Sequence, residues 1–402
     1  MSSIVWRWTA SSVQRGSDGA CAYNLARAMP LRRPPVRRCS TETRRAAMHR
    51  SPAAKQRPRV VVLRPGALGD ALLSFPTLAL LRARMPDARI TFVARADVLP
   101  LALRAHLADA AYSFDLPAWS ALWRTTSAHE PLLSAELDGA DMVIAWLRDA
   151  EGIVAASLAT RGVKRAVVAP GCPGEEGEPA ASTAREHAAL YLAHATTSLG
   201  IGDAPDCLEQ LSHFTPPLHG ALDHAGAAAL WDASRLPPSG VVALHPGSGG
   251  AAKCWPAASF AALAGRLRTA GYHPLLIEGP ADGAAVAAVM QSLRRSSIAD
   301  PPAVARELSL ETLAAALVRC AAFIGNDSGV SHLAGLCAVP TLALFGPTDP
   351  AVWAPVGSHV RVVRAEPPPD APEARRPHSR MDDLSVEIVW QQLAALLAEA
   401  RI

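Results

Sequence analysis

Two successive series of short apolar runs and helical patterns constrain the fold of this chain more than any other feature. The first series begins at residues 60–63, Val-Val-Val-Leu, and the second at residues 241–244, Val-Val-Ala-Leu. Such runs are typical of parallel strands buried on both faces, and strands that alternate with helices predict βαβ units. The sequence therefore predicts an α/β fold with two Rossmann-like domains.

The expected elements follow from this alternation. In the first series we expect strands at 60–63, 89–94, 112–114, 141–146 and 165–168, with helices at 71–85, 98–110, 118–125, 152–160 and 186–199. In the second we expect strands at 241–244, 274–277, 321–324, 341–345 and 360–363, with helices at 257–270, 281–295, 310–320, 330–337 and 381–402. Between the two series, residues 200–240 contain five prolines, which predicts an inter-domain linker toward the end of this stretch.

These patterns predict four parts of the chain. Residues 1–58 form a disordered basic extension, and residues 59–236 form an amino-terminal Rossmann-like domain. Residues 237–380 form a second Rossmann-like domain, and residues 381–402 form a closing helix that packs back across the domains.

The charge is concentrated in the amino-terminal segment. Residues 1–59 hold 12 Arg and one Lys against one Asp and one Glu, a net charge of +11, whereas the whole chain carries +3 and the remainder therefore −8. A mildly acidic folded part argues against nucleic acid as the main partner. The basic segment is interpreted as a membrane-binding arm, a transit peptide, an unstructured tail, or the result of an upstream start where Met48 is the true one.

Neither the cysteines nor the apolar stretches indicate a special class of protein. The seven cysteines are scattered without a C-x-x-C pair, which favours reduced cytosolic thiols over disulfides or structural zinc. No apolar stretch approaches the about 20 residues of a membrane span. We therefore predict a cytoplasmic protein, with peripheral contact at the inner membrane surface as an open alternative.

The turn after the first strand carries the first candidate site residue. Gly66 and Gly69 allow close approach of a ligand to the backbone, and Asp70 stands at the start of a helix, where ligands bind in open α/β sheets. The helix N-terminus stabilises an ionised carboxylate, which suits a general base. Asp70 is equally interpreted as a helix cap.

Four further turns follow strands of the second series. Ser248, Gly249 and Lys253 lie in a Gly-rich turn that suits an anion, and Asp327, Ser328, Gly329 and His332 lie where a strand leads directly into a helix. Asp282 follows another strand, where it either binds a ribose hydroxyl or caps its helix. Residues 345–350 form a rigid loop. For each turn the alternative is an ordinary loop or a capped helix with a core histidine.

The pattern of the turns is more specific than any one of them. In the first domain a carboxylate follows the carboxyl end of a strand. In the second domain, turns suited to anions follow the carboxyl ends of the strands. Glycosyl transfer needs a base for the acceptor hydroxyl and groups that stabilise a leaving diphosphate. No D-x-D motif and no cluster with metal-ligand spacing is present in the sequence, so we expect neither a metal nor another cofactor, with backbone N–H groups and Lys253 holding the diphosphate.

Three motifs resemble glycosyltransferase family 9, the ADP-heptose:lipopolysaccharide heptosyltransferases. They are Arg-Pro-Gly-Ala-Leu-Gly-Asp at 64–70, Gly-Asn-Asp-Ser-Gly-Val-Ser-His at 325–332 and Leu-Phe-Gly-Pro-Thr-Asp-Pro at 344–350. The resemblance covers most of residues 59–357. It implies a GT-B fold with two domains facing across a cleft, inversion at the anomeric carbon, no required metal, an ADP-heptose donor and a lipid-linked core oligosaccharide acceptor. It also implies that residues 59–236 are the acceptor-side domain and residues 237–380 the nucleotide-sugar-binding domain.

The resemblance also implies roles for single residues. Asp70 matches the family's base, and Lys253 and Ser248 match its phosphate-contacting positions. Asp327, Ser328 and Gly329 match the turn that contacts sugar and diphosphate, followed by His332, and Asp282 matches the acidic residue for the ribose. The loop between His245 and Lys253 is richer in Gly and Ala than is usual in the family. Acceptor residues are expected within 95–140.

Two other functions stay open at this stage. One is a non-catalytic nucleotide-sugar binder, or a family member with a different donor and acceptor. The other is an NAD-dependent dehydrogenase, which the absence of G-x-G-x-x-G after the first strand of either domain disfavours.

Overall fold

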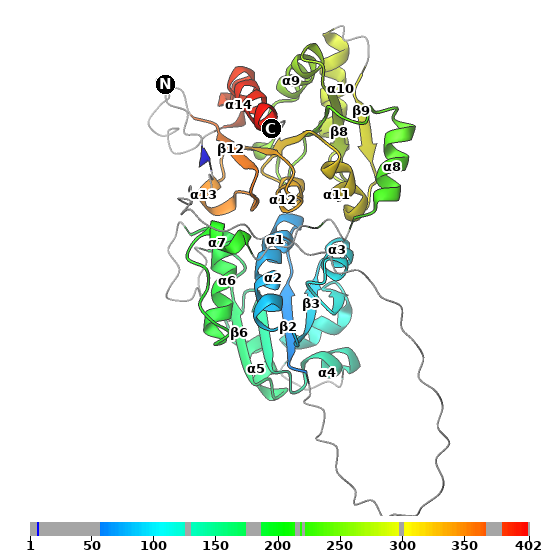
Figure 1. Ribbon diagram of the computed structural model, residues 1–402. Helices are drawn as coiled ribbons and strands as arrows, with labels where there is room; N and C mark the ends of the chain where they lie inside the picture. Colours follow the sequence, from blue (N-terminus) through cyan, green and yellow to red (C-terminus); the bar gives the residue numbers. More distant parts are fainter. Residues whose placement is uncertain are drawn as a thin grey trace, which may run out of the picture. The chain divides into compact units, whose positions relative to one another are not determined.

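The computed structural model describes residues 6–7, 57–124, 130–173, 186–213, 218, 222–296, 301–366 and 380–400. In Figure 1 the first domain is coloured from blue to green and the second from green to red, except for the dark blue strand of residues 6–7. Of the extension predicted for residues 1–58, the structure describes only residues 6–7 and 57–58. Its disorder and the domain boundaries stay predictions.

The first domain is built on a five-stranded parallel sheet. Its strand order is β4-β3-β2-β5-β6, and every neighbouring pair is parallel. The strands are β2 (Arg59–Arg64), β3 (Arg89–Ala94), β4 (Ala110–Ser113), β5 (Met142–Trp146) and β6 (Arg165–Ala169). The helices are α1 (Leu68–Leu73), α2 (Phe75–Arg84), η1 (Ala96–Val98), α3 (Leu99–Arg104), η2 (Pro117–Trp123), α4 (Pro131–Leu137), α5 (Ile153–Thr160), α6 (Ala188–Ser198) and α7 (Leu208–Ser212).

The second domain is built on a seven-stranded sheet of order β1-β12-β11-β10-β7-β8-β9. Its strands are β1 (Trp6–Arg7), β7 (Val241–His245), β8 (His273–Glu278), β9 (Ala303–Arg306), β10 (Ala322–Asn326), β11 (Thr341–Phe345) and β12 (Val360–Arg364); β1 is antiparallel to β12, and the other pairs are parallel. The helices are α8 (His224–Ala233), η4 (Ala251–Lys253), α9 (Ala257–Thr269), α10 (Gly283–Arg295), α11 (Leu310–Val318), α12 (Gly329–Leu336), α13 (Pro350–Trp353), η6 (Met381–Asp383) and α14 (Val386–Glu399).

Alternate residues of the central strands enter different cores. Val60 and Val62 of β2 lie in one cluster with α2 and α6, whereas Val61 and Leu63 lie in a second cluster with α4 and α5. The period of two follows from strand geometry, and it explains why β2 is apolar throughout. The cluster of Val60 continues into α11 and α12, so apolar packing joins the two domains.

The predicted helix at 71–85 is divided in the structure. Helix α1 ends at Leu73 and α2 begins at Phe75, with the Ser74 hydroxyl donating to the carbonyl of Ala71 at 2.6 Å. Pro76 lacks the N–H that would continue the first helix, so the chain restarts there. The predicted helix at 98–110 also ends early, at Arg104, and β4 follows from Ala110.

The stretch predicted as a linker contains helices α7 and α8. Helix α8 packs on α11 of the second domain, with the Asp223 carboxylate accepting from Thr312 Oγ1 at 2.8 Å and Arg319 lying over the Trp231 ring at 4.6 Å. Helix α8 therefore packs on the second domain although it precedes the start predicted for that domain at residue 237. Prolines before and after the helix concealed it in the sequence.

Helix α14 packs on the second sheet. Its buried residues Val389, Leu393, Leu396 and Leu397 lie in the core with β7, α9 and α10. The sequence predicted that this closing helix would pack back across both domains. Its buried apolar residues instead lie in the core of the second domain. Its buried face has the width of a single core-facing stripe.

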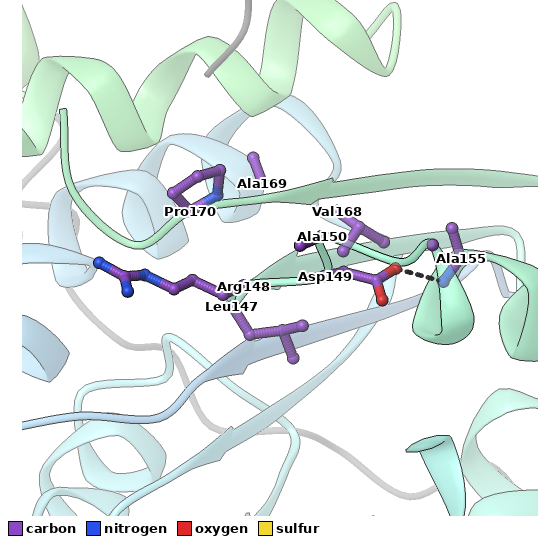
Figure 2. A pocket seen from close by; sticks show the side chains of 9 residues that line it. Leu147, Arg148, Asp149, Ala150, Ala155, Val168, Ala169 and Pro170 are labelled. Atoms are coloured by element: carbon purple, nitrogen blue, oxygen red, sulfur yellow. Dashed lines mark hydrogen bonds between the residues drawn. The ribbon is translucent and has the colours of Figure 1, made fainter. Parts of the chain in front are cut away.

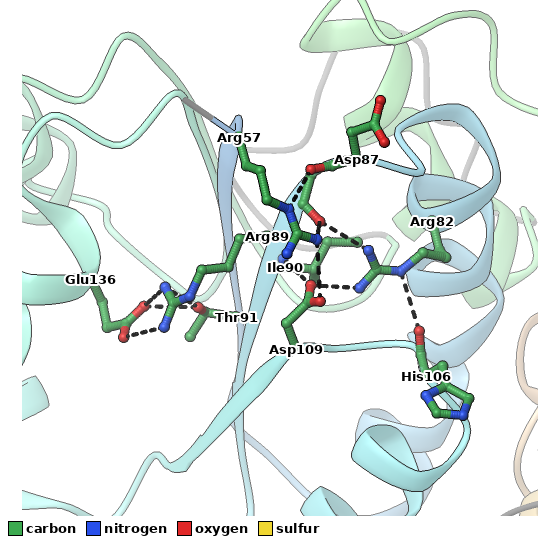
Figure 3. Close-up of polar contacts among 10 residues, drawn as sticks. Arg57, Arg82, Asp87, Arg89, Ile90, Thr91, His106, Asp109 and Glu136 are labelled. Atoms are coloured by element: carbon green, nitrogen blue, oxygen red, sulfur yellow. Dashed lines mark hydrogen bonds and ion pairs between the residues drawn. The ribbon is translucent and has the colours of Figure 1, made fainter. Parts of the chain in front are cut away.

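Ionic contacts fix the amino-terminal edge of the first sheet (Figure 3). The Glu136 carboxylate accepts from Arg89 at 2.7 and 2.9 Å, from Thr91 at 2.8 Å and from Tyr112 at 3.0 Å. Burial alone would raise the pKa of Glu136, but the hydrogen bonds from Arg89 and Thr91 outweigh it and lower the pKa. Nearby, Asp109 accepts from Arg82 at 2.6 Å. This edge is structural and lies opposite the edge that carries the site.

Candidate active site

Asp70 lies directly after the carboxyl end of β2, in the first turn of α1. One carboxylate oxygen accepts from the Ala67 N–H at 2.9 Å, and the other pairs with Arg64 at 3.3 Å. The side chain nevertheless keeps 32% of its surface exposed. The carboxylate therefore caps its helix and stays accessible, so the two sequence interpretations are compatible.

The turn that precedes Asp70 depends on glycine. Gly66 has a φ of +129°, and a Cβ at this position would lie 2.8 Å from Asp70 Oδ2. Arg64 is buried beneath the turn, where its guanidinium also donates to the Gly171 carbonyl at 2.7 Å. Arg64 thus connects Asp70 with the segment that follows β6.

Asp327 is the centre of the polar cluster in the second domain. Its Oδ2 accepts from Lys253 Nζ and from Thr348 Oγ1, both at 2.8 Å, and its backbone carbonyl accepts from Ser248 Oγ at 2.6 Å. These contacts bring the loops after β7, β10 and β11 together. The predicted residues Ser248, Lys253 and Asp327 are therefore in one cluster, whereas Gly249 lies exposed with open space where a side chain would be.

Ser328 caps helix α12, which begins at Gly329. The Ser328 side chain accepts from the N–H of Ser331, and the helix is buried along its whole length except at Gly329. The N-terminus of a helix supplies N–H groups and a positive dipole end to an anion. The first turn of α12 is thus suited to a phosphate beside Lys253.

Helices α1 and α12 bring the two domains into contact at the site. A Cβ at Gly69 would lie 3.0 Å from the His332 ring, and a Cβ at Gly329 would lie 2.5 Å from Leu68 Cγ. Each glycine therefore permits an approach that an alanine would obstruct. Asp70, next to Gly69, is brought to the helix that the Asp327 turn begins.

His332 is buried between these groups. Its burial lowers the pKa to about 4, against the attraction of Asp327 and Asp70. The imidazole is therefore neutral at pH 7, with one N–H to donate. Its buried Nδ1 has no hydrogen-bond partner among the described residues. Carboxylates from both domains thus act on the same ring.

Asp282 lies inside the second domain, beside His245. Its side chain is buried, and its Oδ2 accepts from His245 Nε2 at 2.9 Å and from the Gly279 N–H at 3.0 Å. The side chain does not cap helix α10. The ribose contact expected from the sequence stays a prediction.

Three residues of the cluster were missed as site residues although each stands in a motif noted in the sequence. Asn326 is fully buried and accepts from the Trp255 N–H at 3.0 Å while donating to the carbonyls of Pro246 and Gly247 at 2.9 and 3.2 Å. Thr348 contacts Asp327, and His245 contacts Asp282. Their position at strand ends was a signal that could have marked them as site residues. Their contacts could not be predicted, because they join loops that are distant in the sequence.

A pocket of about 420 Å³ opens at the carboxyl ends of β5 and β6 (Figure 2). Its lining includes Leu147, Arg148, Asp149 and Pro170. The Asp149 carboxylate accepts from the N–H groups of Val154 and Ala155 at 3.0 and 2.9 Å. The Arg148 side chain points away from the Asp149 side chain. The pocket lies on the Asp70 edge of the first sheet, outside the 95–140 segment predicted to hold acceptor residues.

Within the described ranges, no three His, Cys, Asp or Glu side chains form a group that could hold a metal ion. In the same part of the chain, no helix combines the length and apolar character of a membrane span.

Comparison with known proteins identifies the second domain. Residues 215–382 match the model of glycosyltransferase family 9, described as heptosyltransferase. This domain belongs to glycosyltransferase family 9. The family predicted from the three sequence motifs is thus confirmed, and the matched range includes both α8 and the whole Asp327 cluster.

Curated proteins similar to this chain are heptosyltransferases. Lipopolysaccharide heptosyltransferase 2 of Salmonella typhimurium is 30% identical over 154 residues, which are 37% of this chain and 44% of the relative. Lipopolysaccharide heptosyltransferase 1 of Pseudomonas aeruginosa is 36% identical over 110 residues, 27% of this chain and 29% of the relative. The aligned segments thus span less than half of these relatives.

Solved structures extend the likeness to both domains. The glycosyltransferase family 9 protein of Veillonella parvula has a TM-score of 0.65 at 22% identity, covering 86% of this chain and 99% of the other. E. coli ADP-heptose lps heptosyltransferase II has a TM-score of 0.63 at 20% identity, covering 86% of this chain and all of the other. The predicted fold, two parallel-sheet α/β domains of the GT-B class, is confirmed.

Proposed function

We propose that this protein is an inverting glycosyltransferase that transfers a heptose from ADP-heptose to a lipopolysaccharide-core acceptor. The observation that carries the proposal is the contact of α1 with α12, which brings Asp70 to the anion-binding turn of the family 9 domain. The E. coli relative of similar fold is named for ADP-heptose, and another, WaaC, with a TM-score of 0.57 at 19% identity over 84% of this chain and 99% of the other, was solved with ADP.

In this proposal Asp70 is the general base. Its exposed carboxylate takes the proton of the acceptor hydroxyl, whose oxygen attacks the anomeric carbon as the bond to the diphosphate breaks. Pairing with Arg64 and the Ala67 N–H fixes the direction of the carboxylate. A single displacement of this kind inverts the anomeric configuration.

The second domain holds the leaving diphosphate. The N–H groups of the first turn of α12 and the Lys253 ammonium face the negative charge that develops as the bond breaks. The neutral His332 ring supplies one further N–H donor, and Gly249 leaves room for the donor above the loop. We assign no cofactor or metal to these steps.

The acceptor belongs to the first domain. The pocket between β5 and β6 is on the same sheet edge as Asp70 and is connected to it through Arg64 and Gly171. We propose that this pocket receives part of the acceptor. Because such an acceptor is lipid-linked, the enzyme would work at the cytoplasmic face of the inner membrane.

The Asp70→Asn variant tests the assigned base. It should reduce heptose transfer at least about 100-fold, since a positioned base typically contributes a factor of 10² to 10⁴. Calorimetric affinity for ADP should stay within about threefold, because Asp70 touches the acceptor and not the diphosphate. Asp138→Asn, an exposed carboxylate at the opposite sheet edge, serves as the matched control.

The outcomes separate the alternatives. Full transfer by Asp70→Asn would refute the role of the base. Wild-type protein that binds ADP-heptose but transfers to no core acceptor would instead be a non-catalytic binder or a transferase with a different acceptor.

A further inference from the structure

Three neighbouring strand ends in the second sheet bring together a serine, a histidine and an aspartate. Strand β7 lies between β10 and β8, and His245 is its last residue. Asp282 follows β8, and Ser328 follows β10. Because parallel strands end at the same edge, the residues after the outer strands lie on either side of His245.

The three side chains form a continuous hydrogen-bonded row. His245 Nδ1 lies 3.2 Å from Ser328 Oγ, and His245 Nε2 lies 2.9 Å from Asp282 Oδ2. The exposed fractions are 2% for His245, 8% for Ser328 and 9% for Asp282. Because the three side chains are buried, their hydrogen bonds are made to each other and not to solvent.

The direction of the hydrogen bonds follows from Asp282. Burial alone would raise the pKa of Asp282, but the hydrogen bonds from His245 and the Gly279 N–H lower it, so the carboxylate is ionised and accepts only. His245 therefore donates through Nε2, and its Nδ1 hydrogen-bonds with the Ser328 hydroxyl. Ser328 Oγ also accepts from the Ser331 N–H, which is the cap of α12.

The loop above Asp282 is closed over the carboxylate. A Cβ at Gly247 would lie 1.9 Å from Asp282 Oδ1, so the backbone of the Gly-rich loop packs directly on this side chain. Asp282 thus supports two parts of the site at once: the loop that leads to Lys253, by packing, and the cap of α12, through His245.

We propose that Asp282 and His245 are positioning residues that hold Ser328 as the cap of α12 and thereby orient the N–H groups that bind the donor diphosphate. Asp282 accordingly does not bind the ribose. This inference rests on the proposed function, since it assigns the pair to the diphosphate end of the same donor site.

Binding of three probes separates positioning from ribose contact. In Asp282→Asn the affinities for inorganic pyrophosphate and for ADP should each fall about tenfold, while the affinity for adenosine stays unchanged; one hydrogen bond to a charged group is of this size. If Asp282 bound the ribose, the variant would instead lose affinity for adenosine and keep its affinity for pyrophosphate. Glu387→Gln, an exposed carboxylate on α14, is the matched control.

Two histidine variants test the two arms of the row. His245→Gln keeps a polar group near the Nε2 position, facing Asp282, and removes the one facing Ser328. His245→Asn does the reverse, because its shorter amide reaches only the Nδ1 position. Each breaks the row, so both should lower pyrophosphate affinity by the factor seen in Asp282→Asn.

Ser328 variants show whether the pair acts through the cap, and they keep the test valid if a histidine variant fails to fold. Ser328→Ala should lower pyrophosphate affinity, and Ser328→Thr, which keeps the hydroxyl, should restore it. Combining Asp282→Asn with Ser328→Ala should cost no more than Ser328→Ala alone.

Each remaining result overturns the inference. Additive losses in the double variant, or a loss confined to adenosine and ADP, would exclude positioning through Ser328 while leaving the proposed function intact. Wild-type protein that binds neither ADP nor pyrophosphate would refute the donor assignment, and the positioning role with it.

Discussion

Lowering the pH should destabilise the protein through a buried histidine at the boundary of its domains. His187 caps α6 of the first domain: its Nδ1 accepts from the Ala189 N–H at 3.2 Å, and its Nε2 donates to the Ala354 carbonyl of the second domain at 2.9 Å. A second proton would have to bind Nδ1, where it would face another N–H. Burial lowers the pKa of His187 to about 4, although the hydrogen bond to Ala354 opposes the shift.

The sign and size of the effect follow from this pKa. The unfolded chain binds its proton near pH 6.5 and the folded protein only near pH 4, so the stabilisation by neutral His187 is complete above pH 6.5 and is lost as the pH falls toward 4. The difference corresponds to about 3 kcal/mol when both states have titrated, and about 2 kcal/mol of it is lost between pH 7 and pH 5.

Urea unfolding at pH 7, 6 and 5 measures the effect in wild-type protein and in His187→Asn. Asparagine keeps an oxygen that can cap α6 but does not titrate, so the variant should lose about 2 kcal/mol less free energy of unfolding over this range. The control is His106→Asn, because His106 is exposed and its φ of +56° suits asparagine. If His187→Asn showed the same pH dependence as wild type, the argument from burial would be wrong.

Two further variants test packing. Gly329→Ala should force α1 from α12, since its Cβ would lie 2.5 Å from Leu68 Cγ; transfer activity and Tm should fall, and Leu68→Ala in the same chain should recover both. Glu136→Ala should lower the free energy of unfolding by about 2–4 kcal/mol, because it leaves Arg89 without its buried partner. In the same denaturation assay the exposed Glu387→Ala should match wild type, and an equal loss there would contradict the role of burial.

Local patterns in the sequence were sufficient for the fold class and for most elements. Runs such as residues 60–63 and 241–244 have the composition of strands buried on both faces, and the structure places both as central strands. The predicted helices were wrong where prolines lie within or beside a helix. Pro76 divided one expected helix, and the prolines at 205–238 concealed α8, whose stability comes from packing on α11.

The sequence by itself also determined which turns carry polar groups, because Gly-rich and acidic turns after strands are recognisable one at a time. Asp70, Lys253 and Asp327 were predicted as site residues in this way. Only the tertiary structure decided which of these groups meet. Lys253 contacts Asp327 and His245 contacts Asp282 across separations that no local pattern encodes, since the order of strands in a sheet sets which loops are neighbours. That order, and the burial it imposes, also places Asp282 beside His245.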